Sequence, residues 1–158
     1  GDICNNVLFG ESRGGNSDGD VREALDLAQA SEFVEKLPQG IRASIAQGGS
    51  NVSGGQKQRL SIARALARKP EILVFDDSFS ALDYRTDAKL RAGLARELKD
   101  VTKLIVAQRI GTIRDADKVI VLDEGKIAGM GTHEELMRTC PVYQESARSQ
   151  LSPDGLGA

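Results

Sequence analysis

Hydrophobic residues change their spacing about halfway along this 158-residue chain. Between residues 21 and 37 they recur at helical spacing until Pro38 and Gly40, which predicts one helix. A second amphipathic helix is expected from about Gly55 to Lys69, where Pro70 stops it. Beyond that proline, short apolar runs alternate with helix-compatible segments, so the pattern indicates strands and helices in turn.

The second half of the chain is typical of an α/β fold. Strands are expected at Ile72–Asp76, Lys103–Ala107 and Lys118–Leu122, with a helix from about Arg85 to Leu98 between the first two. Short apolar strands alternating with helices predict a parallel sheet that is buried on both faces.

Turn and capping residues mark the rest of the chain. The Gly/Asn/Ser/Asp-rich stretch 13–20 predicts a loop, and Glu124-Gly125 predicts a tight turn into residues 126–128. Thr132-His133-Glu134-Glu135 has the spacing of a capping box and opens a last helix to about residue 148, with His133 exposed in its first turn. The Gly/Pro-rich tail 152–158 is expected to be disordered.

Composition narrows the function classes. The net charge of −2 gives no bulk attraction to nucleic acid. Aromatic residues are scarce and Trp is absent, which argues against a surface on which nucleic-acid bases stack. Aliphatic runs are too short to cross a bilayer, and no signal peptide is visible at the start. Cys4 and Cys140 stand alone without metal-ligand spacing, which indicates reduced thiols in a cytosolic domain.

Candidate chemistry begins with Ser53-Gly54-Gly55-Gln56, the signature segment, directly before a basic helix. The two glycines allow close backbone approach, and Ser53 can cap the helix. A helix N-terminus offers free N–H groups and partial positive charge, which suit a phosphate. Taken alone, the segment favours an ordinary Gly-rich turn before a surface helix. The side chains of Lys57, Gln58 and Arg59 are expected to form only the solvated face of that helix.

The apolar run 72–75 leads into two further polar segments. It ends in the acid pair Asp76-Asp77, and Ser80-Ala81-Leu82-Asp83 follows. Ligands of α/β sheets bind beyond the carboxyl ends of the strands, so the Asp76 carboxylate is expected in such a crevice. The three segments, in this order and spacing, resemble the signature loop, Walker B strand and D-loop of ATP-binding-cassette (ABC) ATPases.

The resemblance implies a partial domain. It predicts the P-loop NTPase fold of ABC-type ATPases: residues 2–69 form a helical subdomain with the signature, and residues 70–150 form the parallel-sheet half with Walker B, D-loop and switch. The P-loop half is absent, because no Gly-x-x-x-x-Gly-Lys-[Ser/Thr] motif occurs. We therefore expect the sequence to start just after the Q-loop, with residues 1–150 as the C-terminal part of a nucleotide-binding domain.

The resemblance also assigns roles to individual residues, with ATP and Mg²⁺ as cofactors. Asp76 is the Walker B carboxylate for Mg²⁺. Asp77 stands where active members carry the general base Glu, on a side chain one methylene shorter. Gln108 stands where the family carries its switch histidine, and its amide carries no titratable proton. Ser53 to Gln56 bind the ATP of a partner domain, and the D-loop residues are Ser80, Ala81, Leu82 and Asp83.

An intact signature beside two altered catalytic positions resembles one half of a heterodimeric exporter. The implied partners are a second, non-identical nucleotide-binding domain and a fused or associated transmembrane domain, at the cytoplasmic face of the membrane and without nucleic acid. The segments 131–136 and 143–146 also resemble exporters, whereas residues 44–49 lack the charges that exporters carry before the signature. Two alternatives stay open: a soluble ABC-type ATPase of DNA ends, chromosomes or ribosomes, and an inactive truncated fragment.

Overall fold

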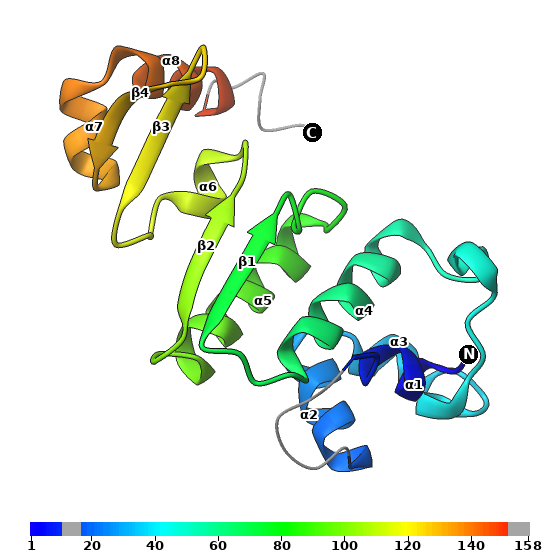
Figure 1. The fold of residues 1–158 in the computed structure, drawn as a ribbon. Helices are drawn as coiled ribbons and strands as arrows, with labels where there is room; N and C mark the ends of the chain where they lie inside the picture. Colours follow the sequence, from blue (N-terminus) through cyan, green and yellow to red (C-terminus); the bar gives the residue numbers. More distant parts are fainter. Residues whose placement is uncertain (11–16, 152–158) are drawn as a thin grey trace. The chain divides into compact units, whose positions relative to one another are not determined.

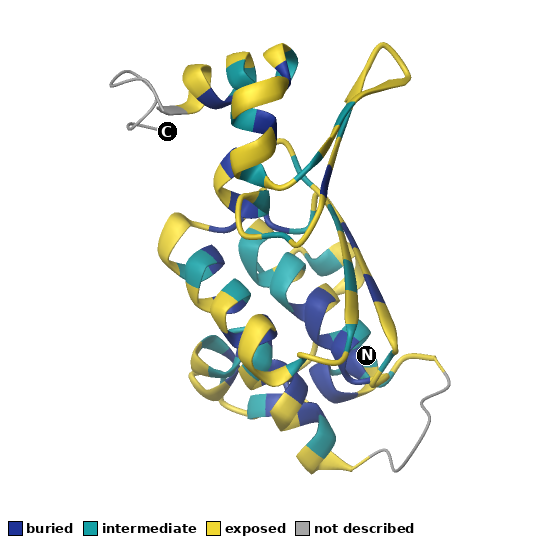
Figure 2. Cartoon of the chain, turned by 90° about the vertical axis from the view of Figure 1, so that its left-hand side faces the viewer, coloured by how far each residue is buried: buried dark blue, intermediate teal, exposed yellow. Residues whose placement is uncertain are grey.

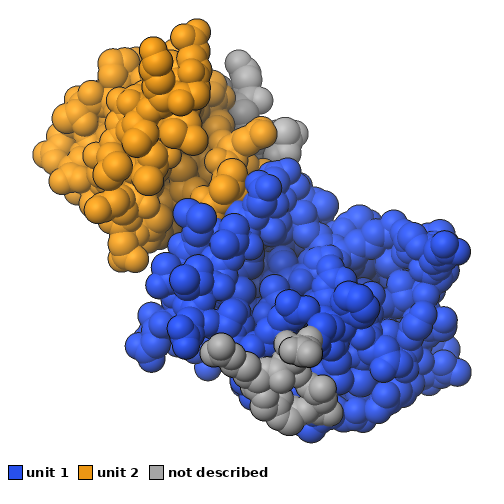
Figure 3. Space-filling model, viewed as in Figure 1, with its two compact units in different colours: residues 1–104 blue, residues 105–158 orange. Residues whose placement is uncertain are grey.

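A computed structural model describes residues 1–10 and 17–151 and divides the chain into two compact units, Gly1–Leu104 and Ile105–Ala158 (Figures 1 and 3). In the described residues, no helix is long and apolar enough to cross a membrane. The predicted tail 152–158 and part of the predicted loop 13–20 lie outside the described residues.

The first unit is mainly helical. Its helices are α1 (Ile3–Val7), α2 (Asp18–Leu27), α3 (Ser31–Glu35), the 3-10 turns η1 (Gly40–Arg42) and η2 (Gln47–Gly49), α4 (Gly54–Leu66) and α5 (Tyr84–Glu97). Helix α4 packs against α1 and α2 (Figure 1). Apolar side chains from these helices, including Leu25, Leu60 and Leu90, are buried, so the helix that carries the signature segment is anchored by its core face.

The prediction of one helix over residues 21–37 is wrong. The helix stops at Leu27, because Gln29 adopts a left-handed backbone conformation with φ 57°. The Gln29 carbonyl accepts a hydrogen bond of 2.9 Å from Nη1 of Arg59. This contact bridges 30 residues of sequence, so local helical spacing could not predict the break.

Strands β1 (Ile72–Asp76) and β2 (Thr102–Val106) form a two-stranded sheet, connected through α5 and running in the same direction in Figure 1. Successive strand residues face opposite sides, and along β1 buried and exposed residues alternate (Figure 2). Ile72 and Val74 are 64% and 61% exposed. The prediction of a sheet buried on both faces is therefore wrong for this chain, since its described elements bury only the face of Leu73 and Phe75.

The second unit contains α6 (Ile110–Ile113), β3 (Val119–Asp123), β4 (Lys126–Gly131), α7 (His133–Thr139) and α8 (Pro141–Leu151). Strand β3 pairs antiparallel with β4, so the prediction that residues 118–122 join the parallel sheet is wrong. The tight turn between them is confirmed: Glu124 and Gly125 have φ values of 47° and 76°. Two consecutive positive φ values suit a two-residue hairpin and favour pairing with the next strand.

The capping box at Thr132 is confirmed, because Thr132 Oγ1 accepts from the Glu135 N–H and Glu135 Oε2 accepts from the Thr132 N–H. The prediction of a single last helix is wrong. Helices α7 and α8 are separated at Cys140, whose backbone is extended before Pro141. A proline disfavours the helical conformation in the residue before it.

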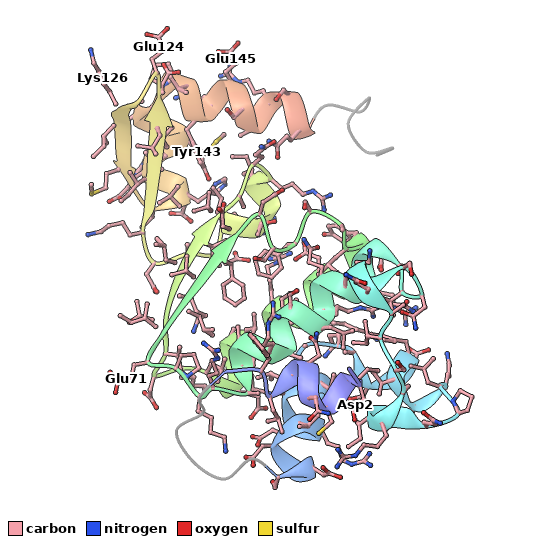
Figure 4. The ribbon with its side chains drawn as sticks, turned by 45° about the vertical axis from the view of Figure 1, so that its right-hand side comes forward. Asp2, Glu71, Glu124, Lys126, Tyr143 and Glu145 are labelled. Atoms are coloured by element: carbon pink, nitrogen blue, oxygen red, sulfur yellow. The ribbon has the colours of Figure 1, made fainter. Side chains whose placement is uncertain are left out.

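The expected exposure of His133 is also wrong. This residue is half-buried, and its Nδ1 lies 2.9 Å from the hydroxyl oxygen of Tyr143. Tyr143 lies on the side of α8 toward the hairpin, and Glu145 points away from it (Figure 4). Both cysteines are free thiols, and both are buried.

Candidate functional site

The signature segment forms the N-terminus of α4, as its composition predicts. Ser53 is the N-cap: its Oγ accepts from the Gln56 N–H at 3.2 Å, and Gln56 Oε1 accepts from the Ser53 N–H at 2.9 Å. This reciprocal capping box satisfies two of the free donors of the helix end. It leaves the N–H groups of Gly54 and Gly55 at the helix terminus for another acceptor.

The two glycines meet different surroundings. A Cβ at Gly54 would contact nothing within 4 Å, whereas one at Gly55 would lie 3.1 Å from the carbonyl oxygen of Ala81. Gly54 therefore opens toward free space, and Gly55 lets the helix approach the chain after β1. Free N–H groups at an open, positively polarised helix terminus fit a phosphate.

The acid pair ends strand β1. Asp76 is its last residue, and both Asp76 and Asp77 have exposed side chains. Asp77 has φ 48°, a left-handed conformation that Asp adopts more readily than most residues. The chain turns sharply at Asp77, so the two carboxylates follow a buried strand without being buried themselves.

The segment from Asp77 to Asp83, here called the β1 loop, is held by the signature helix. Gln58 Nε2 donates to the Asp77 carbonyl at 3.2 Å, and Gln58 Oε1 accepts from the Ala81 N–H at 3.0 Å. Ser80 Oγ also donates to the Asp77 carbonyl, at 3.0 Å. The signature segment, the acid pair and the D-loop residues thus belong to one bonded assembly in the first unit.

The four predicted D-loop residues are placed differently. Leu82 is buried, while Ser80, Ala81 and Asp83 are exposed. Asp83 is the N-cap of α5 and accepts from the Thr86 N–H at 3.0 Å and the Thr86 hydroxyl at 2.6 Å. These hydrogen bonds lower the pKa of the Asp83 carboxyl below its ordinary value.

A groove of about 430 Å³ joins the helix and the strand in the first unit. Gly54 and Gln58 lie on one wall, and Val74, Asp76 and Ser78 lie on the other. The groove therefore brings the open glycine and the candidate metal ligand to a common surface with an apolar patch.

A magnesium ion fits this site only with further ligands. Among residues 1–10 and 17–151, no three His, Cys, Asp or Glu side chains gather closely enough to hold a metal. Asp76 offers a single exposed carboxylate, which suits Mg²⁺ that takes its other ligands from water and phosphate.

Gln108 belongs to the second unit, in the segment 107–110 that leads from β2 into the first residue of α6, here called the β2 loop. Its side chain is exposed, and its carbonyl accepts from Gln150 Nε2 at 2.9 Å. Gln150 Oε1 accepts in turn from the Ile110 N–H at 2.8 Å. The backbone at the predicted switch position is thus fixed by a glutamine on α8.

Sequence reasoning missed two structural roles on α4. Gln58, expected to lie on a solvated face, is half-buried and bonds the β1 loop. Arg59 donates to Gln29 and stacks its guanidinium over Phe33, 5.0 Å from the ring centroid. No local signal identifies either role, because the partner atoms come from distant segments.

Three comparisons with known proteins show what the chain is similar to. Residues 6–80 match the family model described as ABC transporter, a range that includes the signature segment and the acid pair. An uncharacterised ABC transporter ATP-binding protein of Mycobacterium tuberculosis is 49% identical over 154 residues, which are 95% of this chain and 26% of that protein. A Lactococcus lactis multidrug resistance ABC transporter ATP-binding and permease protein is 39% identical over 152 residues, 96% of this chain and 26% of its own length.

A solved structure gives the same fold. The ATP-bound structure of a bacterial Atm1-family ABC exporter aligns with a TM-score of 0.90 at 36% identity, covering 96% of this chain and 26% of the exporter chain. The mixed α/β fold of a partial ABC ATPase domain is therefore confirmed. The chain spans about a quarter of the length of the relatives it matches.

Proposed function

Because this chain is part of the nucleotide-binding domain of an ABC transporter, we propose that it lends its signature segment to ATP held by a second such domain. The N-terminus of α4 carries this proposal. Its capping box orders the helix end, and Gly54 faces open space where a phosphate can approach. Ser53 and the glycine N–H groups would bind that phosphate.

We propose that the ATP site built on this subunit's own acids is impaired. Asp76 would hold Mg²⁺, which neutralises phosphate charge when bound. Asp77 places its carboxylate about 1 Å shorter than Glu would, and a misplacement of that size can reduce the rate about 10²-fold. Gln108 can donate to a phosphate but supplies no positive charge. The partner would then carry the Glu and His that are missing here.

We propose an exporter as the full protein. The Lactococcus relative is named an ATP-binding and permease protein, and the Atm1-family chain is named an exporter. By this likeness a transmembrane domain would be fused to or associated with the chain, and the domain would lie at the cytoplasmic face of the membrane. We expect the 158 residues by themselves not to hydrolyse ATP, since they contain no Walker A motif.

The test compares two substitutions in the full-length protein with its partner. Gly54→Asp puts a carboxylate where the phosphate would approach, and we expect ATP turnover to fall about 100-fold or more. Asp77→Ala removes a carboxylate from the impaired site, and we expect turnover to stay within about twofold. ATPase rates of the reconstituted pair decide the matter, and the opposite ranking would refute the proposal.

A gain of activity gives an independent test. The double substitution Asp77→Glu and Gln108→His should restore hydrolysis at this subunit's own site. It supplies a general base whose side chain is one methylene longer and an imidazole ring that can carry a proton. The rate is measured after the partner's own base has been removed, with that partner variant and the unchanged subunit as control. No gain above this control would contradict the assignment of both positions.

A further inference from the structure

Gln58 lies one turn inside α4 with its side chain half-buried, and both the nitrogen and the oxygen of its amide bond the same loop. The amide N–H₂ donates to the Asp77 carbonyl, and the amide oxygen accepts from the Ala81 N–H. Only one orientation of the amide permits both bonds, since the other would place donor against donor and acceptor against acceptor. The two ends of the turn after β1 are therefore held by a single side chain.

A second contact joins the same two elements. Gly55 lies three residues before Gln58, on the same side of α4, where a Cβ would lie 3.1 Å from the Ala81 carbonyl oxygen. The backbones of the helix terminus and the loop are thus closely packed. The side-chain bonds of Gln58 act across an interface that already has little free space.

The loop held in this way has an unusual conformation. Asp77 has φ 48°, a conformation of low population for a non-glycine residue. Its carbonyl accepts from both Gln58 and Ser80. Such conformations persist where neighbouring bonds fix them, and the Gln58 bond to the Asp77 carbonyl comes from outside the loop.

We propose that Gln58 is a positioning residue that makes the signature segment and the β1 loop move as one body. This proposal rests on the proposed function, in which Ser53 to Gln56 bind the partner's ATP while Asp76 and Asp77 face this subunit's own ATP. A shift of α4 on engaging the partner's phosphate would then displace Asp77 and Ala81 through the Gln58 amide. Gln58 thus carries coupling between the two nucleotide sites without touching either nucleotide.

The experiment uses the full-length subunit with its partner and two variants of Gln58. Gln58→Leu has similar volume and loses both hydrogen bonds, and Gln58→Glu keeps the acceptor but loses the donor. Gln39, which is exposed and whose side chain forms no hydrogen bond with the residues that the structure describes, receives the same two substitutions as control. Hydrogen exchange at the Ala81 amide and the ATPase rate are measured for all four variants.

For Gln58→Leu we expect exchange at Ala81 to be about fivefold faster, as for the loss of one ordinary hydrogen bond. In the Asp77→Glu and Gln108→His subunit beside the partner that lacks its base, where this subunit's own site would hydrolyse ATP, we expect Gln58→Leu to lower kcat about tenfold with KM for ATP within about twofold, because the ATP contacts themselves remain. Exchange and kcat that both match the Gln39→Leu control would overturn the proposal.

Gln58→Glu separates positioning from mere folding. Lowering the pH toward the ordinary Glu pKa of about 4.3 protonates the new carboxyl, whose O–H can then donate to the Asp77 carbonyl. At neutral pH the carboxylate introduced by Gln58→Glu would face the Asp77 carbonyl oxygen and repel it, so exchange at Ala81, corrected for intrinsic rates, should be faster than in the unchanged protein. Protonation should slow this exchange again in the Gln58→Glu variant alone, and its failure to slow would count against Gln58. If the unchanged pair does not hydrolyse ATP, the proposed function fails, while the exchange result still decides whether Gln58 holds the loop.

Discussion

The β1 loop and the β2 loop are each held by the side-chain amide of one glutamine, but the two glutamines differ in burial. In the first unit Gln58 bonds the Asp77 carbonyl and the Ala81 N–H, and in the second Gln150 bonds the Gln108 carbonyl and the Ile110 N–H. Each glutamine amide thus pairs with one acceptor and one donor of a loop that carries a position predicted to be catalytic.

The difference lies in what surrounds each amide. Gln58 is half-buried inside α4, and the close approach of Gly55 and the Ser80 hydroxyl support the same loop. Gln150 is exposed and is the second-last residue of α8. Helix ends open more readily than helix interiors, so the β2 loop depends on the packing of α8 and should be the easier of the two to release.

The largest expected effect comes from loosening that packing. Leu136 is 1% exposed and belongs to a cluster with Ile110 and Tyr143. Leu136→Ala should destabilise the second unit by about 2–5 kcal/mol, since it removes buried methyl groups and leaves a cavity. Exchange at the Ile110 amide should rise accordingly, while the Ala81 amide stays slow.

The exposed neighbour Arg138, replaced by Ala, serves as the control for this variant. A rise at Ala81 equal to that at Ile110 would mean that both loops open together, and the comparison between them would fail.

Substitution of Gln150 tests whether its amide holds the β2 loop. Gln150→Leu deletes both bonds to the β2 loop, and we expect the Ile110 amide to open with a free energy lower by about 1 kcal/mol. The same substitution at the exposed Arg148 should leave this amide unchanged. Equal exchange in the two variants would show that Gln150 does not fix the loop.

The contacts of these two glutamines could not be predicted from the sequence. Strand β1 has the predicted bounds, and the signature helix starts within one residue of the prediction, because apolar runs, Ser caps and prolines act locally. The partners of Gln58 and Gln150 are up to 23 and 42 residues away, so only the folded chain brings them together. The fold class followed from local patterns together with the family resemblance, whereas the loop contacts, the break at Gln29 and the antiparallel pairing of β3 required tertiary structure.

Two glycine substitutions test how closely the N-terminus of α4 packs against the β1 loop. Gly54→Ala should stabilise α4 by about 0.5–1 kcal/mol, because Ala is the better helix former and its Cβ meets open space. Gly55→Ala should lose this gain, since its Cβ would lie 3.1 Å from the Ala81 carbonyl oxygen. Hydrogen exchange of the α4 amides measures how readily this helix opens in each variant. Equal stabilisation by Gly54→Ala and Gly55→Ala would contradict the close approach of Gly55 to the Ala81 carbonyl.

The smallest expected effect is a pH dependence confined to the β1 loop. Hydrogen bonds from the Thr86 hydroxyl and N–H lower the pKa of Asp83, so the folded form binds its proton less readily than the unfolded chain. The resulting stabilisation of the start of α5 is fully present above the unfolded value of about 3.9 and is lost as the pH falls through the lower folded pKa. Exchange protection at the Thr86 amide, corrected for intrinsic rates, should therefore decrease when the pH is lowered below about 4.

The control is Asp83→Asn, which keeps a capping oxygen that does not titrate and should remove this decrease. The Ile110 amide, held by Gln150, should show no such transition in either form. A transition at Ile110 that tracks the one at Thr86 would mean that the two loops share one titrating group.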